Sequence, residues 1–304
     1  TATANALAGK VAKGDQVFNV RDYGAVSGGS TGTNGTAFTN TLAAVIAAGG
    51  GVMFIPPGDY NIGATTLTLS NNKNVTIEGA GYQSTVVRCS GQFLAASNNS
   101  DMGRVAGIYL ICTTTTNTTS GIVVDYPRRW IIERCRIDGY GGDAIRYQGG
   151  IHSAVRWCYF IAKDASGANG NSAINIEESS GLVVATTITT ERNYVGSGKT
   201  YGYRWYKATN SLSIGDIAEL VSTGVGMRLH QAGVTVIDLY TEANLNHFEM
   251  FDSPNVVVGN LRNEPVVTWL NVAAADRYIT RIGRSTVQAG KGILFGGTAA
   301  GNDV

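Results

Sequence analysis

Four glutamates in the second half of the chain have the residue type and the regular spacing needed for acid–base chemistry. They are Glu191, Glu219, Glu242 and Glu264. Neighbouring carboxylates raise each other's pKa, so that one group stays protonated as a general acid while another acts as base or nucleophile. Glycoside hydrolases use such pairs, about 5–5.5 Å apart in retaining enzymes and about 6.5–9.5 Å apart in inverting enzymes. The four glutamates are therefore candidate catalytic residues.

Basic and aromatic residues fall at neighbouring positions of the same pattern. They are Lys163, Arg204, Arg228, Tyr240 and Arg262. Their donor groups suit an anionic or neutral sugar chain, so we interpret them as candidate substrate-binding residues. A lyase would need a base and a group that neutralises a uronate, and Arg262 with Lys163 could serve. The alternative is a solvated charged face with ion pairs between coils, such as Arg228 with Glu249.

A repeat of roughly 22 residues must position these side chains. Cys112, Cys135 and Cys158 stand 23 residues apart, and Cys89 lies 23 residues further upstream. Pairs of large apolar residues, two positions apart, recur in the same frame. A gap of two places both members on one face of a β-strand. The pairs are Ile122 and Val124, Ile145 and Tyr147, Ile174 and Ile176, Tyr203 and Trp205, Met227 and Leu229, and Phe248 and Met250.

Each unit contains two more apolar positions. The second set is Ile132, Val155, Val184 and Val258, and the third is Ile137, Phe160, Ile188, Ile217, Leu239, Leu261 and Ile282. Two or three short strands per unit are typical of a parallel β-helix, whereas a propeller blade needs about 40 residues. The crossover rule makes the helix right-handed. The sequence therefore predicts an all-β, single-stranded, right-handed parallel β-helix.

Alignment of the coils on the third apolar position predicts where the glutamates lie. Three residues further on, the side chain points outward. This places Glu242 and Glu264 on adjacent coils, about 4.8 Å apart, and Glu191 two coils from Glu242, about 9.6 Å away. On the intervening coil the row position is Leu220, and Glu219, the residue beside it, falls between them. The row therefore offers both of the spacings that glycoside hydrolases use.

Composition agrees with the fold and excludes several functions. Glycine supplies 40 of 304 residues, against an average share of about 7%, and only five residues are proline. The net charge of +1 gives no electrostatic case for nucleic acid or a membrane surface, and no apolar run reaches the ~20 residues of a membrane span. The spacing of Cys and His fits no metal site, so we expect no metal or cofactor. The cysteines are expected to be buried, stacked thiols, with the match of Cys89 due to chance.

Three N-terminal motifs resemble a known family. They are the runs 17–26 (VFNVRDYGAV), 49–60 (GGGVMFIPPGDY) and 74–81 (NVTIEGAG). Together they resemble the opening of the pectate-lyase-like superfamily, which includes rhamnogalacturonase- and epimerase-type domains and phage tailspikes. The resemblance implies a right-handed β-helix with a short N-terminal capping helix. The acidic pair common in such domains is missing from residues 27–36, so we expect Asn34 and Thr36 to cap a helix starting near Ala37.

The domain prediction is an N-terminal lead or cap over residues 1–16 and a β-helix domain over 17–304. Within the lead, the Ala-rich segment 2–12 is expected to form either a short helix over the end of the stack or a flexible connection. Both the resemblance and the glutamate row favour binding and cleavage of a bacterial surface or extracellular polysaccharide, by hydrolysis in preference to elimination. The alternatives are a non-catalytic phage tail or receptor-binding module, commonly a homotrimer, and a secreted bacterial enzyme. The expected location is extracellular or on a virion.

Overall fold

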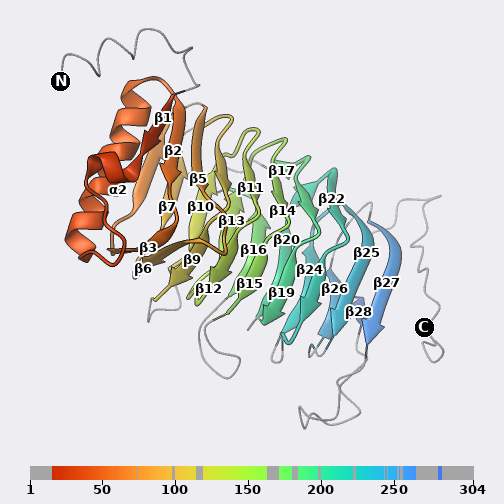
Figure 1. Ribbon diagram of the computed structural model, residues 1–304. Helices are drawn as coiled ribbons and strands as arrows, with labels where there is room; N and C mark the ends of the chain where they lie inside the picture. The colour runs from red at the N-terminus through yellow and green to blue at the C-terminus, as the bar shows by residue number, and fades with distance from the viewer. Residues whose placement is uncertain are drawn as a thin grey trace.

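The computed structural model describes the chain as a β-solenoid whose coils stack from the N-terminal helix toward the C-terminus (Figure 1). It describes residues 16–264 and 280–282, apart from 73, 98–99, 114–118, 163–170, 180–183, 198–199, 222–223, 243, 245, 252 and 254–255. Every strand pairing in it is parallel, as a coiled chain requires. The predicted right-handed parallel β-helix is confirmed. Of the expected N-terminal lead, only residue 16 lies within the described part.

Each coil contributes one strand to a nine-stranded sheet. Its inward side chains form two continuous apolar columns, and the predicted pairs at Ile122, Ile145, Ile174, Tyr203, Met227 and Phe248 lie in register. The period-two prediction is therefore confirmed for this sheet. Its strands are β4 (Leu67–Ser70), β7 (Leu94–Ser97), β10 (Ile122–Asp125), β13 (Ile145–Gln148), β16 (Ser172–Glu177), β20 (Tyr201–Tyr206), β24 (Val225–His230), β26 (Asn246–Phe251) and β28 (Thr280–Ile282).

The other strands form a 17-stranded sheet with a corner along its length. Strands before the corner are β1 (Val17–Asn19), β2 (Gly51–Ile55), β5 (Val75–Gly79), β8 (Arg104–Ala106), β11 (Ile131–Glu133), β14 (Ala154–Arg156), β18 (Thr189–Glu191) and β22 (Ser211–Ile214). Strands after it are β3 (Gly58–Gly63), β6 (Thr85–Cys89), β9 (Tyr109–Cys112), β12 (Arg136–Asp138), β15 (Tyr159–Ile161), β19 (Tyr194–Ser197) and β23 (Ile217–Glu219). Both β25 (Val234–Glu242) and β27 (Val257–Glu264) cover the two parts, and β17 (Ala185–Thr186) pairs with β21 (Ala208–Thr209) separately.

The third apolar column differs from the predicted one. Ile137 and Phe160 are partners, but the column continues through Val195, Ala218 and Thr241. Ile188 precedes β18, on the other side of the corner. The prediction was wrong here because Ile188 and Val195 are both buried, and only the short strand β18 and the turn after it separate them. Likewise Val184 is 39% exposed, and Thr190 takes the place opposite Val155.

The cysteines form two short columns in place of the predicted column of three. Cys89 is the partner of Cys112 at the ends of β6 and β9, with 3.9 Å between the sulfur atoms. Cys135 and Cys158 occupy the corner turns of the next two coils. All four are buried free thiols, as predicted. The 23-residue interval is the length of a coil, but Cys112 is the last residue of β9, whereas Cys135 lies in the turn before β12 begins.

A helix covers the N-terminal end of the stack, as predicted (Figure 1). The helix α2 (Thr31–Ala47) follows the 3-10 turn η1 (Val20–Tyr23), and it begins six residues earlier than expected. Its N-cap is Ser30, whose hydroxyl accepts from the amide of Thr33. Asn34 is buried and accepts from the amide of Val26, so it holds the preceding turn in place and does not cap the helix. Leu42 and Val45 face the core.

Gly103 is a position where the packing leaves no room for a side chain. A Cβ there would lie 2.2 Å from Cε2 of the buried Trp130. We expect Gly103→Ala to lower the free energy of unfolding by ~1–3 kcal/mol, the usual cost of overpacking a core. Urea denaturation measures it. Gly32→Ala in α2 is the control, because its Cβ meets no atom within 4 Å and alanine favours helix. Equal stability of the two variants would contradict the packing described.

Candidate functional site

The outer face of the nine-stranded sheet carries a column of basic and amide side chains. Arg146, Asn175, Arg204 and Arg228 are register partners on four successive coils, and Glu249 follows on the fifth. They point outward because they alternate with the inward apolar pairs. Successive strands lie about 4.8 Å apart, so guanidinium and amide groups recur at that interval. Such a column can bind several acidic groups of one extended chain.

Glu177 holds two of these arginines in place. One carboxylate oxygen accepts from Nε of Arg146 at 2.6 Å and from Gln148 at 3.2 Å. The other accepts from Nη1 of Arg204 at 3.0 Å and from Asn175 at 3.1 Å. The carboxylate is therefore fully used by the protein, which makes Glu177 a positioning residue for its neighbours.

Asp143 is the titratable group that the surrounding residues leave unsatisfied. It lies just before β13 and its side chain is 5% exposed. Oδ2 accepts from Nδ2 of Asn175 at 2.9 Å, while Oδ1 has no hydrogen-bond partner among the residues that the structure describes. Burial raises the pKa of Asp143, and the polar groups of Asn175 and Ser172, together with the charge of Arg146, oppose that rise only in part. A carboxyl group that binds a proton in this way can act as a general acid.

Aromatic rings complete the face toward the C-terminal coils. The guanidinium of Arg204 lies 5.4 Å from the ring centroid of Tyr206, and the Lys207 ammonium 5.3 Å from it. The next coil places His230 5.1 Å from Tyr206, ring centroid to centroid.

The predicted catalytic row is brought together in part, on the other sheet. Glu219, Glu242 and Glu264 are register partners on three successive coils. Glu219 accepts from the Tyr194 hydroxyl at 2.6 Å, and Glu242 accepts from Tyr240 at 2.8 Å. Arg262 is the register partner of Tyr240. The predicted adjacency of Glu242 and Glu264 therefore holds at the level of the backbone.

Three other predicted residues lie away from that row. Glu191 ends β18 before the corner, between Arg156 and Ile214, because the alignment on Ile188 chose the wrong strand. Arg204 and Arg228 belong to the nine-stranded sheet, where Arg228 lies 3.8 Å from Glu249, the ion pair considered from the sequence. Lys163 lies outside the described residues.

Sequence reasoning missed the residues that the nine-stranded sheet gathers. They are Asp143, Arg146, Asn175, Glu177, Tyr206 and His230. The signal was present, because the positions between and after the members of each apolar pair are the outward positions of that sheet. They read Arg-Gln, Asn-Glu, Arg-Tyr and Arg-His in four successive units. Attention to the third column alone left this pattern unused.

A second buried carboxyl, Asp216, stabilises the fold, and its raised pKa predicts that the free energy of unfolding depends on pH. It accepts from Ser213 at 2.6 Å, from the amide of Asn193 at 3.0 Å and from Thr190. Burial raises its pKa to about 6, above the usual value near 3.9 that the unfolded chain has. The folded state thus holds its proton more tightly. The stability it contributes is complete below pH ~4 and is lost as pH rises through about 6, a change of ~2–3 kcal/mol.

The measurement is the free energy of unfolding in urea between pH 4 and 7. Asp216→Asn should flatten the curve across that window, because an amide carries no proton to release, and the hydroxyls of Ser213 and Thr190 can turn to accept from it. A wild-type curve that rises with pH over the same window, and that Asp216→Asn leaves unchanged, would contradict the assignment.

Comparison with known proteins agrees with this architecture. Residues 17–246, well over half of the chain, match the model of the rhamnogalacturonase A/epimerase, pectate lyase-like family. The chain belongs to this family. A 77-residue segment is 36% identical to mannuronan C5-epimerase AlgE6 of Azotobacter vinelandii, covering 23% of this chain and 8% of that protein. The chain thus spans a small part of that relative's length.

Solved structures of similar fold cover most of this family member. The A-module of mannuronan C-5 epimerase AlgE4 from Azotobacter vinelandii matches with a TM-score of 0.55 at 16% identity, over 90% of this chain and 89% of the module. An alginate lyase from Paenibacillus matches with a TM-score of 0.58 at 11% identity, over 84% and 97%. A GH87 α-1,3-glucanase from Streptomyces thermodiastaticus matches at 0.57 and 17%, over 93% and 70%. At these identities the likeness establishes the fold alone. Among the described residues, we find no helix suited to crossing a membrane.

Proposed function

We propose that this family member binds and chemically modifies a polysaccharide that carries carboxylate groups, at the outer face of the nine-stranded sheet. The observation that carries the proposal is Asp143, a buried carboxyl with a raised pKa and one oxygen without a partner, beside Asn175 and Arg146. A strongly perturbed acid next to a column of cations is a candidate catalytic group. A mannuronan C-5 epimerase module and an alginate lyase are among the proteins of similar fold.

The arginine column defines the substrate class. Arg204 and Arg228 lie one coil apart, and Arg146 lies two coils from Arg204 with Asn175 between them. The interval between coils is close to the length of one pyranose unit in an extended polysaccharide. Glu177 neutralises part of the charge of Arg146 and Arg204 and fixes their guanidinium groups in place. A uronate chain presents one carboxylate per sugar, so it can bind several coils at once.

This arrangement suits proton abstraction next to a carboxylate. Cations around a uronate carboxylate lower the pKa of the C–H bond beside it, because they stabilise the negative charge that develops there. Asp143 in its protonated form donates a hydrogen bond to the same charge, and a hydroxide from water accepts the proton from carbon. Return of a proton gives an epimer, while loss of the neighbouring glycosidic oxygen gives an unsaturated product.

Hydrolysis by the glutamate row is the second candidate. It is favoured by the register of Glu219, Glu242 and Glu264 on adjacent coils, about 4.8 Å apart. In this proposal Tyr240, Arg262 and Lys163 bind the sugar, and a pair of glutamates acts as acid and nucleophile. Glu191, Arg204 and Arg228, which were expected beside this row, lie elsewhere.

Three product assays separate these reactions. Purified protein is incubated with polymannuronate, polygalacturonate and α-1,3-glucan. Ultraviolet absorbance detects an unsaturated uronate, reducing ends without absorbance indicate hydrolysis, and proton NMR detects epimerisation. We expect a uronate polymer to react, with Arg204→Gln reducing turnover and the pair Glu242→Gln and Glu264→Gln leaving it unchanged. The reverse result would support the hydrolase and overturn the first proposal.

The proposed substrate also bears on where the protein acts. Polysaccharides of this kind lie on or outside cells, so we propose an extracellular or virion-associated protein. Binding without turnover in every assay would favour a non-catalytic receptor-binding module, for example of a phage tail. Light scattering on the purified chain then tells the expected homotrimer from a monomer.

A further inference from the structure

One turn at the corner of the 17-stranded sheet is longer than the others. Two residues join the strands at the corners from β8–β9 to β22–β23, such as residues 134–135 between β11 and β12. Five residues, 80–84, join β5 to β6. Both flanking strands keep their register with the next coil, so the additional residues project outward. The turn therefore overhangs the neighbouring coils.

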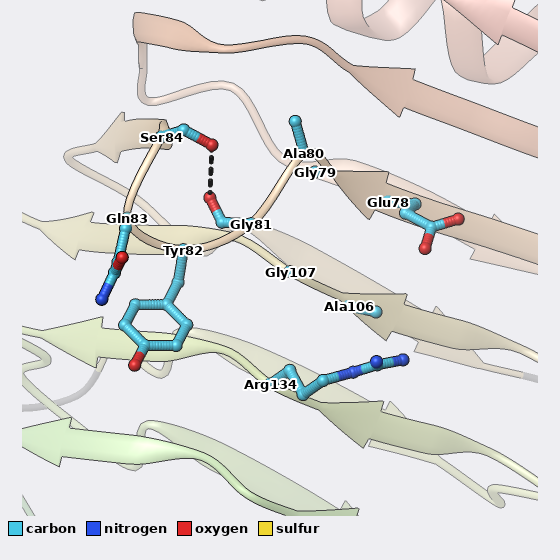
Figure 2. A pocket seen from close by; sticks show the side chains of 10 residues that line it. All are labelled: Glu78, Gly79, Ala80, Gly81, Tyr82, Gln83, Ser84, Ala106, Gly107 and Arg134. Atoms are coloured by element: carbon cyan, nitrogen blue, oxygen red, sulfur yellow. Dashed lines mark hydrogen bonds between the residues drawn. The ribbon is translucent and has the colours of Figure 1, made fainter.

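Two hollows lie on either side of this turn and share Tyr82 and Gln83. Figure 2 shows the first, where Tyr82 and Gln83 hang from the turn and Glu78 and Arg134 lie at the opposite end. Its volume is about 530 Å³, and its floor contains Ala106 and Gly107. The second, of about 520 Å³, is lined by Tyr82, Gln83, Tyr109, Arg136 and Tyr159. Together they form a groove that spans several coils.

Exposed aromatic rings mark this corner. Tyr82 is 38% exposed and Trp157 is 41% exposed, the highest values for a Phe, Tyr or Trp side chain among the residues whose exposure the structure describes. Trp157 lies at the corner of the coil that follows the coil of Arg134. The backbone amide of Arg134 donates to the carbonyl of Arg156, the residue just before Trp157, so the two corners are adjacent. The guanidinium of Arg156 lies 4.8 Å from the Trp157 ring centroid. A large exposed ring beside polar groups suits a ligand with apolar faces and hydroxylated edges.

The floor of the second hollow is already ordered. Arg136 lies between two rings, 4.7 Å from the centroid of Tyr109 and 5.1 Å from that of Tyr159. Tyr159 stacks on Tyr194 with centroids 4.6 Å apart. Asp138 accepts from the Tyr109 hydroxyl at 2.6 Å and from Arg136 at 2.8 Å. A ligand that binds here finds these donors in fixed positions, which reduces the entropy lost on binding.

We propose that this corner is a second saccharide-binding site, separate from the site on the nine-stranded sheet. Tyr82 and Trp157 stack on sugar rings, and Gln83 and Arg136 donate to sugar oxygens. The choice of a saccharide rests on the proposed function, whereas the groove and its rings do not. A polymer held at two places on one protein has a raised effective concentration at each, so the corner increases avidity without taking part in the reaction.

The experiment measures binding of two probes by the full chain, short mannuronate oligosaccharides and short α-1,3-glucan oligosaccharides. Isothermal titration gives the Kd, and acrylamide quenching of tryptophan fluorescence reports on Trp157. We expect at least one probe to shield Trp157, a signal absent from Trp157→Phe. Tyr82→Ala and Trp157→Ala should each weaken binding about tenfold, the effect of removing a central aromatic contact. Binding of mannuronate alone would identify a uronate site, and binding of both probes a site for sugar rings in general.

Controls keep this result independent of the reaction. Met102→Ala removes a side chain of similar exposure away from the corner and should bind as wild type does. In Asp143→Asn, the probe should still shield Trp157 from acrylamide, even if this variant has no turnover. If the wild-type protein shows no turnover in any assay but the probe still shields Trp157, that result counts against the proposed function and not against the corner site. The corner site is overturned if neither probe shields Trp157, or if Tyr82→Ala and Trp157→Ala both leave the Kd unchanged.

Discussion

Asp143→Asn should reduce turnover of a uronate polymer by ~10²–10⁴-fold, the usual contribution of a positioned general acid. The amide has the shape of the carboxyl group and can keep a contact with Asn175, but it cannot transfer a proton. Folding should not suffer, because the substitution removes a carboxylate that burial disfavours. The measurement is kcat on polymannuronate beside the free energy of unfolding.

The pH dependence gives the same assignment a second test. Burial raises the pKa of Asp143 above its usual value, so the wild-type protein holds the acid proton to a higher pH than a solvent-exposed aspartate does. Turnover should therefore fall as pH rises through that raised pKa. The stability that the protonated group contributes is present below the unfolded pKa and is lost over the same rise.

Asp216→Asn is the matched control for Asp143→Asn. Asp216 is also a buried carboxyl with a raised pKa, and its partners are Ser213, Thr190 and Asn193. It lies in the turn between β22 and β23 of the 17-stranded sheet, whereas the arginine column lies on the nine-stranded sheet. It should alter the pH profile of stability and leave kcat unchanged. Full turnover in Asp143→Asn, or an equal loss in Asp216→Asn, would remove Asp143 from the mechanism.

The sequence was sufficient for the β-helix because burial repeats with the coil. Large apolar pairs such as Ile122 and Val124 are forced inward in each unit, and their spacing fixes strand direction and register together. The corner was beyond the same reasoning. Its left-handed positions are occupied by residues as different as Arg134, Trp157 and Gly215, so no residue type marks the corner. As a result, the alignment put Ile188 in the column position that Val195 occupies in the structure.

The site could be predicted only where it lay next to a correctly aligned strand. Glu219, Glu242 and Glu264 follow the third column and were placed together, whereas Glu191 depended on Ile188 and was not. Asp143 carried no signal of its own, because its importance comes from burial and from the missing partner of Oδ1. Those are properties of packing between coils, which one unit of sequence does not contain.

Glu133→Ala should have the largest effect on stability among the charged residues considered. Glu133 is 3% exposed and its carboxylate accepts from Arg104 at 2.9 Å, from Arg156 at 2.7 Å and from Arg134 at 3.1 Å. Burial alone would raise the pKa of Glu133, but the hydrogen bonds from the arginines outweigh it and lower the pKa. Loss of the carboxylate leaves three guanidinium groups close together without their shared partner.

Breaking a buried ion pair costs about 3–5 kcal/mol, and the partial exposure of the three arginines favours the lower half of that range, about 3–4 kcal/mol. Glu78→Ala is the matched control, because Glu78 pairs with the same Arg104 at 3.3 Å but is 39% exposed, and exposed pairs contribute about 0–1 kcal/mol. Urea denaturation at pH 7 should therefore separate the two variants by at least ~2 kcal/mol. The difference should shrink in acid, because the stability that Glu133 contributes is present above its unfolded pKa and is lost as pH falls through its lower folded pKa. Variants of equal stability at pH 7 would mean that the arginines find other partners, and that the carboxylate does not organise this face of the coil.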